Sequence, residues 1–293
     1  MTWFVIAFIS AFLSALAAIF QKKVLFKESA LEFSFLLSVF NLIFALPFLF
    51  FADYSTLTIP SLLILYGKTI LGALAFWCVM LSLKNLEISR ALPLLVITPA
   101  FVAVFAFVFL SESLNAYQIG GIGLILVGTY ILETKSNNEL LEPFLVFVRS
   151  KKHHYIIFAL LFFTITAIVD KLLLSEYKLP PFTMVGFQQI FFLFNFSLIY
   201  LFVKGNPKKL IKNTNKEIYL WIIVIAIITI GYRWTQIEAF KLAPIALVLA
   251  VKRISVFFAT IIGGKIFKEL NLTRKAIATI IMIIGVFLIN QNL

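Results

Sequence analysis

The stretch IALVLAVKRISVFFATII, residues 245–262, is long enough to cross a membrane, and it carries two adjacent cations at its centre, Lys252 and Arg253. Apart from that pair, Ser255 and Thr260, every residue in it is apolar. About twenty such residues span the hydrocarbon core of a bilayer as a helix. The whole chain shares this character, because its 293 residues are 62% hydrophobic and 13% charged, with a mean hydropathy of +1.06. Soluble domains are nearer half apolar and a quarter charged.

The other hydrophobic residues also fall in blocks of about twenty, separated by charged or Pro- and Asn-rich breaks. This pattern predicts an all-α polytopic membrane protein with ten transmembrane helices. The predicted spans lie near residues 3–25, 31–52, 61–84, 90–110, 115–133, 155–174, 181–203, 218–240, 243–266 and 273–291.

The two halves of the chain repeat each other. One constant offset aligns Trp77 with Trp234, and the same offset aligns Lys84 with Lys241, Glu112 with Glu269 and Gly128 with Gly285. Each half holds five predicted spans, an odd number, so the two halves must lie inverted in the membrane. We therefore predict a first five-helix repeat, a basic linker and a second five-helix repeat, over residues 1–133, 134–154 and 155–293.

The net charge of +12 comes mostly from Lys and Arg in short loops between the spans, near residues 22–27, 84–90, 135–152, 204–216 and 265–275. With ten spans these loops share one face of the membrane. The positive-inside rule then predicts a cytoplasmic basic face and extracytoplasmic termini. We expect an integral protein of a bacterial or archaeal inner membrane, a monomer or a homodimer in the lipid bilayer, with no nucleic-acid partner.

The segments around the two aligned glutamates resemble a known family. They read LLVITPAFVAVFAFVFLSESLNAYQIGGIGLILVGTYIL (94–132) and LAVKRISVFFATIIGGKIFKELNLTRKAIATIIMIIGVFLI (249–289). They resemble the EamA type of the drug/metabolite transporter (DMT) superfamily, which has two inverted five-helix halves. In that family a glutamate closes the fourth and ninth helices, the places of Glu112 and Glu269 here. The family usually keeps both termini cytoplasmic, opposite to the prediction from the charges.

The adjacent Lys252 and Arg253 also resemble a Lys-Arg pair of the sugar-phosphate/phosphate translocator branch, where the pair binds substrate phosphate. Lys252 lies ten residues past Leu242, roughly 15 Å deep and close to the bilayer midplane. A cation there costs at least about 2.5–3.5 kcal/mol, so keeping two indicates a wet cavity, a partner or both. We expect one of the two at least to contact substrate, the alternative being an ion pair that joins helices.

Arg233 lies on the preceding span at nearly the depth of Lys252, and Lys68 is shallower. Glu238 is a possible partner for Arg233, and Lys68 can reach the membrane surface by snorkelling. The acids, Asp170 and Glu238, are placed nearer the ends of their spans. A central surplus of positive charge suits an anion, because Arg offers a planar donor fork and Lys a compact charge.

These residues form the predicted substrate-binding site, together with neutral candidates. The cationic members are Lys68, Arg233, Lys252 and Arg253, and the neutral ones are Tyr66, Thr98, Tyr232, Trp234 and Gln236. Asp170 and Glu238 are the candidates for proton coupling, since a membrane carboxylate can bind a proton when desolvated and release it when wet.

The sequence carries no H-E-x-x-H, Walker A or G-x-S-x-G pattern, and Cys78 is its only cysteine. We therefore predict no enzyme, no metal site and no cofactor. The leading prediction is a secondary transporter that moves a small organic anion, phosphorylated or carboxylated, by alternating access. The alternatives are an exporter of amino acids or drugs, and a lipid-translocating or non-transport membrane protein.

Overall fold

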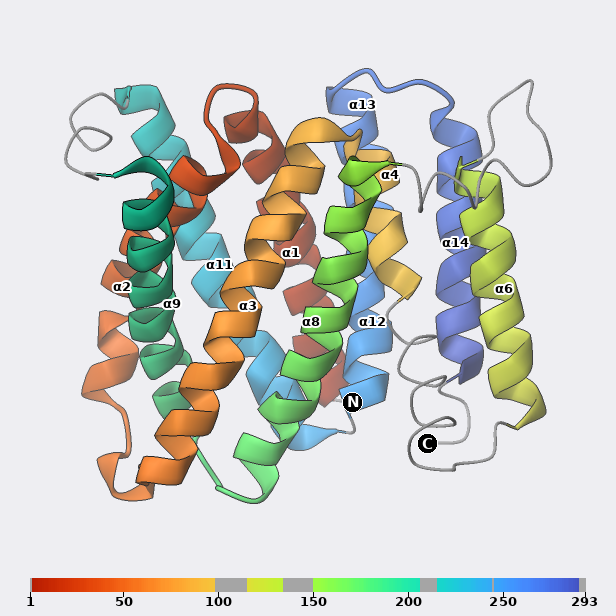
Figure 1. Cartoon of the computed structure of the whole chain (residues 1–293). Coiled ribbons are helices and arrows are strands. Elements are labelled where there is room, and N and C mark those ends of the chain that lie inside the picture. The colour runs from red at the N-terminus through yellow and green to blue at the C-terminus, as the bar shows by residue number, and fades with distance from the viewer. Residues whose placement is uncertain (1, 98–114, 134–149, 206–214, 244, 290–293) are drawn as a thin grey trace.

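A computed structural model describes residues 2–97, 115–133, 150–205, 215–243 and 245–289, which form one bundle of helices (Figure 1). The first half contributes α1 (Thr2–Leu25), α2 (Ala30–Phe50), turn η1 (Tyr54–Thr56), α3 (Ile59–Asn85), α4 (Ile88–Leu94), turn η2 (Leu95–Ile97) and α6 (Ala116–Glu133). The second half contributes α8 (Lys151–Ser175), α9 (Pro181–Lys204), α11 (Lys216–Leu242), α12 (Ile245–Phe258), the π-helical turn η3 (Ala259–Gly263), α13 (Gly264–Ile266) and α14 (Leu272–Ile289). Within these ranges there is no strand.

Each of the ten predicted spans coincides with described helix over at least part of its length. Six helices are long and apolar enough to cross a membrane, namely Trp3–Leu25, Ala30–Phe50, Ile59–Asn85, Lys152–Ser175, Pro181–Lys204 and Lys216–Leu242. The other described helices are shorter or interrupted, so the count of ten stays a prediction. The all-helical fold is confirmed for the described residues.

Local sequence signals set where several helices begin. The Ser29 side chain caps α2 by accepting a hydrogen bond from the Glu32 backbone N–H, and the Glu32 carboxylate accepts one from the Ser29 backbone N–H. Thr58 and Ser61 form the same reciprocal arrangement at the start of α3. Pro181 opens α9, where its missing N–H would have had no partner in the helix. These caps satisfy backbone donors that hydrocarbon would leave unpaired.

The basic turns lie at one end of the bundle, which we call the basic end (Figure 1). The turns after α1, α3 and α13 lie there, at the top of the view, and α9 also ends there. The turns between α8 and α9 and between α11 and α12 lie at the opposite end. The first residue of α1 and the last of α14 point to that opposite end as well. The arrangement agrees with the charge pattern in the sequence.

Contacts between helices follow the internal repeat. Exchanging the two halves maps α1 onto α8 and α3 onto α11. Under that exchange, the packing of α1 against α11 becomes the packing of α8 against α3, and both are present. The pairs α2 with α9 and α6 with α14 map onto themselves, and both are also present. This pattern supports the predicted two-repeat architecture.

Helices α6 and α14 approach closely at two glycines that the repeat aligns. A Cβ atom added at Gly285 would lie 2.6 Å from the Gly121 carbonyl oxygen. One added at Gly128 would lie 2.9 Å from the Ala278 carbonyl oxygen. Real Cβ atoms do not come this near to backbone, so a side chain at either position would push the helices apart.

Gly285→Ala is therefore expected to lower the free energy of unfolding by about 1–3 kcal/mol, the usual cost of overpacking a tight contact. Thermal unfolding of the purified protein in one detergent measures the effect. Gly123→Ala on α6 is the matched control, because a Cβ atom there meets nothing within 4 Å. Equal melting temperatures for the Gly285→Ala variant and the parent protein would contradict the close approach of α6 and α14.

Candidate functional site

A cavity of about 260 Å³ lies inside the bundle, between helices of both repeats. It is lined from the first repeat by α1, α2, α3, α4 and η2, and from the second by α8, α9, α11, α12 and η3. Its charged and amide side chains are Gln21, Asn41, Lys68, Asp170, Gln188, Gln189, Arg233, Gln236, Lys252 and Arg253. The cavity thus lies at the interface between the two repeats.

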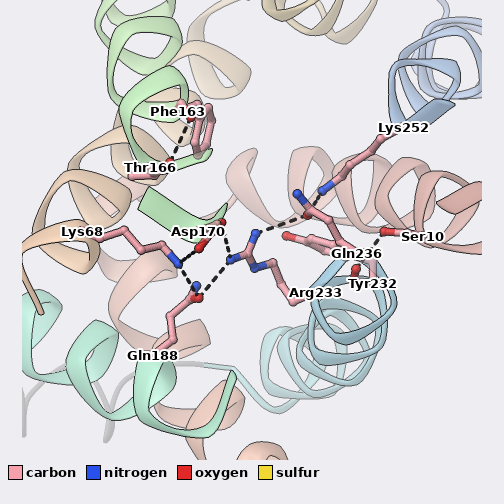
Figure 2. A network of polar contacts seen from close by, with 10 residues as sticks. All are labelled: Ser10, Lys68, Phe163, Thr166, Asp170, Gln188, Tyr232, Arg233, Gln236 and Lys252. Atoms are coloured by element: carbon pink, nitrogen blue, oxygen red, sulfur yellow. Dashed lines mark hydrogen bonds and ion pairs between the residues drawn. The ribbon is translucent and has the colours of Figure 1, made fainter. Parts of the chain in front are cut away.

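Lys68 and Arg233 share two acceptors in this cavity (Figure 2). The ammonium of Lys68 forms an ion pair with Asp170 and donates a 3.0 Å hydrogen bond to Gln188 Oε1. Arg233 donates to the same Gln188 oxygen at 3.0 Å, and its guanidinium lies 3.9 Å from the Asp170 carboxylate. One carboxylate and one amide oxygen therefore lie between two cations.

Gln236 repeats this arrangement between Arg233 and Lys252 (Figure 2). Its Oε1 accepts a 3.2 Å hydrogen bond from Arg233 and a second one from the Lys252 ammonium. That ammonium also lies 5.0 Å from the centre of the Tyr232 ring. An anionic oxygen at the place of either glutamine oxygen would meet two cationic donors, a favourable arrangement for carboxylate or phosphate.

Arg253 lines the same cavity as its neighbour Lys252. The Arg253 Nε atom is buried and has no hydrogen-bond partner among the residues that the structure describes. A buried donor without a partner costs free energy unless a water or a ligand satisfies it. Both cations of the central pair therefore border space that an anion can enter.

Asp170 is placed differently from the sequence prediction. The sequence put it near the mouth of its span, whereas it is 3% exposed and lies in the cavity against Lys68. Lys68 is likewise 4% exposed and does not snorkel to the surface. The reason is that depth along one helix does not reveal what the neighbouring helix presents, and α3 packs directly against α8. Arg233 also contacts Asp170, in place of the predicted partner Glu238.

Several predicted site residues lie away from the cavity. Tyr66 packs against Phe191, with ring centres 5.3 Å apart. Trp234 packs against both Phe48 and Phe182, and Glu238 is not among the lining residues. Thr98 falls outside the described residues. Of the neutral candidates, Tyr232 and Gln236 line the cavity.

Other lining residues were not predicted from the sequence, and Gln188 is the most important of them. Gln188 and Gln189 lie side by side in the middle of the apolar helix α9, and Asn41 lies within α2. A polar side chain inside a membrane span is costly unless it has a partner or faces water. An amide inside an apolar block was therefore the available signal.

Polar contacts at the basic end join the two repeats. The Glu269 carboxylate accepts hydrogen bonds from the backbone N–H groups of Ile88 at 2.7 Å and Ser89 at 3.0 Å, at the start of α4, and from the Ser89 hydroxyl. Lys275 forms an ion pair with Glu87 beside it. The aligned residue Glu112 lies outside the described residues, so its surroundings stay a prediction.

The sequence profile of the EamA-like transporter family matches residues 1–134 and 151–291, nearly the whole chain. The chain belongs to the EamA-like transporter family. It is accordingly an integral membrane protein and a membrane transporter of the DMT type, and it is not an enzyme. The predicted membership of the DMT superfamily is confirmed. The predicted likeness of Lys252 and Arg253 to the sugar-phosphate branch stays a prediction.

A solved structure described as "Crystal structure of protein" is similar to this chain, with a TM-score of 0.65 and 12% sequence identity. The match covers 98% of this chain and 96% of that one, so the two share a fold over their full lengths. The search of curated proteins gives no sequence match.

Proposed function

We propose that this EamA-like transporter moves a small organic anion, carboxylated or phosphorylated, by alternating access between its two repeats. The observation that carries the proposal is the charge of the cavity. The described lining contains four cations, Lys68, Arg233, Lys252 and Arg253, and one carboxylate, that of Asp170. Buried cations without a matching number of anions are costly in a membrane, and a bound anion relieves that cost.

The geometry of the cations also favours an anion. Arg233 offers a planar fork of donors, which suits the two oxygens of a carboxylate or phosphate, and Lys252 adds a compact charge beside it. Gln188 and Gln236 hold these cations through weaker, neutral acceptors. A substrate carboxylate or phosphate can replace a glutamine oxygen and make charge-assisted hydrogen bonds in its place.

An exporter of cationic drugs needs the opposite arrangement, an acid free to bind the cation. Asp170 is held by Lys68 and lies beside Arg233, so it is already engaged. An exporter of neutral amino acids would need the cavity cations neutralised, and the described lining supplies one acid for four cations. The anion proposal therefore fits the lining better than either alternative.

A thermal-shift panel on the purified protein tests the proposal. It compares carboxylates and phosphate esters with zwitterionic amino acids and organic cations at one ionic strength. We expect anions to raise the melting temperature, because a ligand that binds only the folded state stabilises it by mass action. Uptake of the best anion into proteoliposomes then tests transport. Stabilisation by cations or zwitterions and by no anion would refute the proposal.

We also propose that both termini are extracytoplasmic, as the positive-inside rule predicts from the basic loops. A reporter fused at Leu293 then gives periplasmic phosphatase activity and no cytoplasmic fluorescence. A second fusion placed in the loop after Lys204 should give the reverse pattern. Fluorescence at Leu293 would instead show the orientation usual for the family.

A further inference from the structure

The cavity changes character along its length. On α3 the lining residues Lys68, Gly72 and Phe76 follow one another at four-residue spacing, and on α9 Gln188, Phe192 and Phe196 do the same. Residues four apart lie on one face of a helix, about 6 Å further along it. The cavity-facing side of each helix therefore passes from polar to aromatic toward the basic end.

We call the aromatic part the phenylalanine compartment, lined by Phe76, Phe163, Phe192 and Phe196. The rings of Phe76 and Phe196 meet edge to face with centres 6.1 Å apart, and the Phe192 ring lies 6.1 Å from that of Phe196. Helix α1 contributes only short side chains and Gln21 to the cavity lining. The four rings give the compartment an apolar wall, and α2 adds Ser34, Ser38 and Asn41 to the cavity lining. The hydroxyls of Ser34 and Ser38 donate to backbone carbonyls of their own helix, so these two side chains are already paired.

Gly72 sets the position of one wall. A Cβ atom added at Gly72 would lie 3.1 Å from Cζ and 3.4 Å from Cε2 of Phe192, so the ring packs directly on the backbone of α3. Any side chain at Gly72 must displace this ring. Gly72 also lies between Lys68 and Phe76, where the charged part of the cavity meets the aromatic part.

We infer that the anion transported through the proposed site carries an apolar, ring-sized group. Its acid group binds among Arg233, Lys252 and Gln188, and its ring lies in the phenylalanine compartment against Phe192. The inference rests on the proposed anion function. It adds that the substrate is amphipathic and short, because eight residues of α3, roughly 12 Å, separate Lys68 from Phe76.

Binding of matched probes tests this inference by isothermal titration calorimetry. One arm compares acetate with phenylacetate, and the other compares inorganic phosphate with phenyl phosphate. Benzyl alcohol supplies the ring without charge. In the arm with the preferred acid group, we expect the aryl anion to bind about ten-fold to a hundred-fold more tightly than the plain anion, from burial of one ring. Tighter binding in the carboxylate arm or in the phosphate arm shows which acid group the site prefers.

A substitution that moves the Phe192 ring provides the sharper experiment. Gly72→Ala should push the Phe192 ring toward the cavity and lower the ratio of aryl-anion to plain-anion affinity about ten-fold. Gly67→Ala is the matched control, because it lies on the same helix and a Cβ atom there meets nothing within 4 Å. The double variant Gly72→Ala/Phe192→Leu removes the crowded ring edge and should fold even where the single variant does not. Its affinity ratio should recover part of the loss.

The outcomes separate the inference from the proposed function. Equal affinities for aryl and plain anions, or an unchanged affinity ratio in Gly72→Ala, would overturn the inference and leave the anion site intact. Failure of all four anionic probes to bind, or equal binding of benzyl alcohol and the aryl anions, would overturn the anion function and the inference with it.

Discussion

Replacing Lys252 with glutamine is expected to weaken binding of the transported anion about thirty-fold to several thousand-fold. Loss of a charged contact in a desolvated site costs about 2–5 kcal/mol, which corresponds to that range of affinity. Lys252 shares Gln236 with Arg233 and lines the cavity, so its loss removes one of two donors at a single acceptor position. Calorimetry with the best anion from the thermal-shift panel measures the change.

Two variants of Arg253, Arg253→Lys and Arg253→Gln, show whether its charge or its shape matters. Arg253→Lys keeps the charge and removes the planar fork, so an affinity loss there shows bidentate recognition. Lys241→Gln is the matched control for Lys252→Gln, since Lys241 is exposed at the end of α11 and does not line the cavity. We expect the control to bind like the parent. If Lys252→Gln, Arg253→Gln and Arg253→Lys also bind like the parent, the pair is structural and the site lies elsewhere.

The fold was predictable because its signals are long and repeated. Blocks of about twenty apolar residues need no knowledge of their neighbours to indicate helices, and charged loops alternate between them in a regular order. The aligned pair Gly128 and Gly285 also marks a contact between two helices, which the sequence analysis did not predict. Both lie at the close approach of α6 and α14, which explains why the two halves repeat them.

The candidate site was predictable only in part. The depth of a residue follows from its own span, whereas a site is formed by side chains from several helices. Arg233, Lys252 and Arg253 were proposed mainly from their depth in their spans, and all three line the cavity. Asp170 was misplaced because its environment comes from Lys68 on α3 and Arg233 on α11, which no feature of its own span reveals. Trp234 and Tyr66 were chosen for their chemistry, but the faces they occupy pack against phenylalanines.

Asp170→Asn is expected to lower the free energy of unfolding by about 3–5 kcal/mol. The carboxylate is buried against Lys68, and breaking a buried pair by removing one partner leaves an uncompensated charge. Arg233, 3.9 Å away, also loses its anionic neighbour. The melting temperature of the purified variant measures the loss. Glu176→Gln, an exposed carboxylate at the end of α8, is the control and should leave stability unchanged.

A second substitution separates the ion pair from the role of Asp170 in transport. Asp170→Asn/Lys68→Met removes both charges, so it should recover most of the stability lost in the single variant. Failure to recover would show that Asp170 mainly balances Arg233 and not Lys68. Recovered stability with uptake that has lost its pH dependence would identify Asp170 as the proton carrier, in preference to Glu238. Recovered stability with an unchanged pH profile would exclude Asp170 from coupling and leave it as the residue that holds two cations in place for the anion.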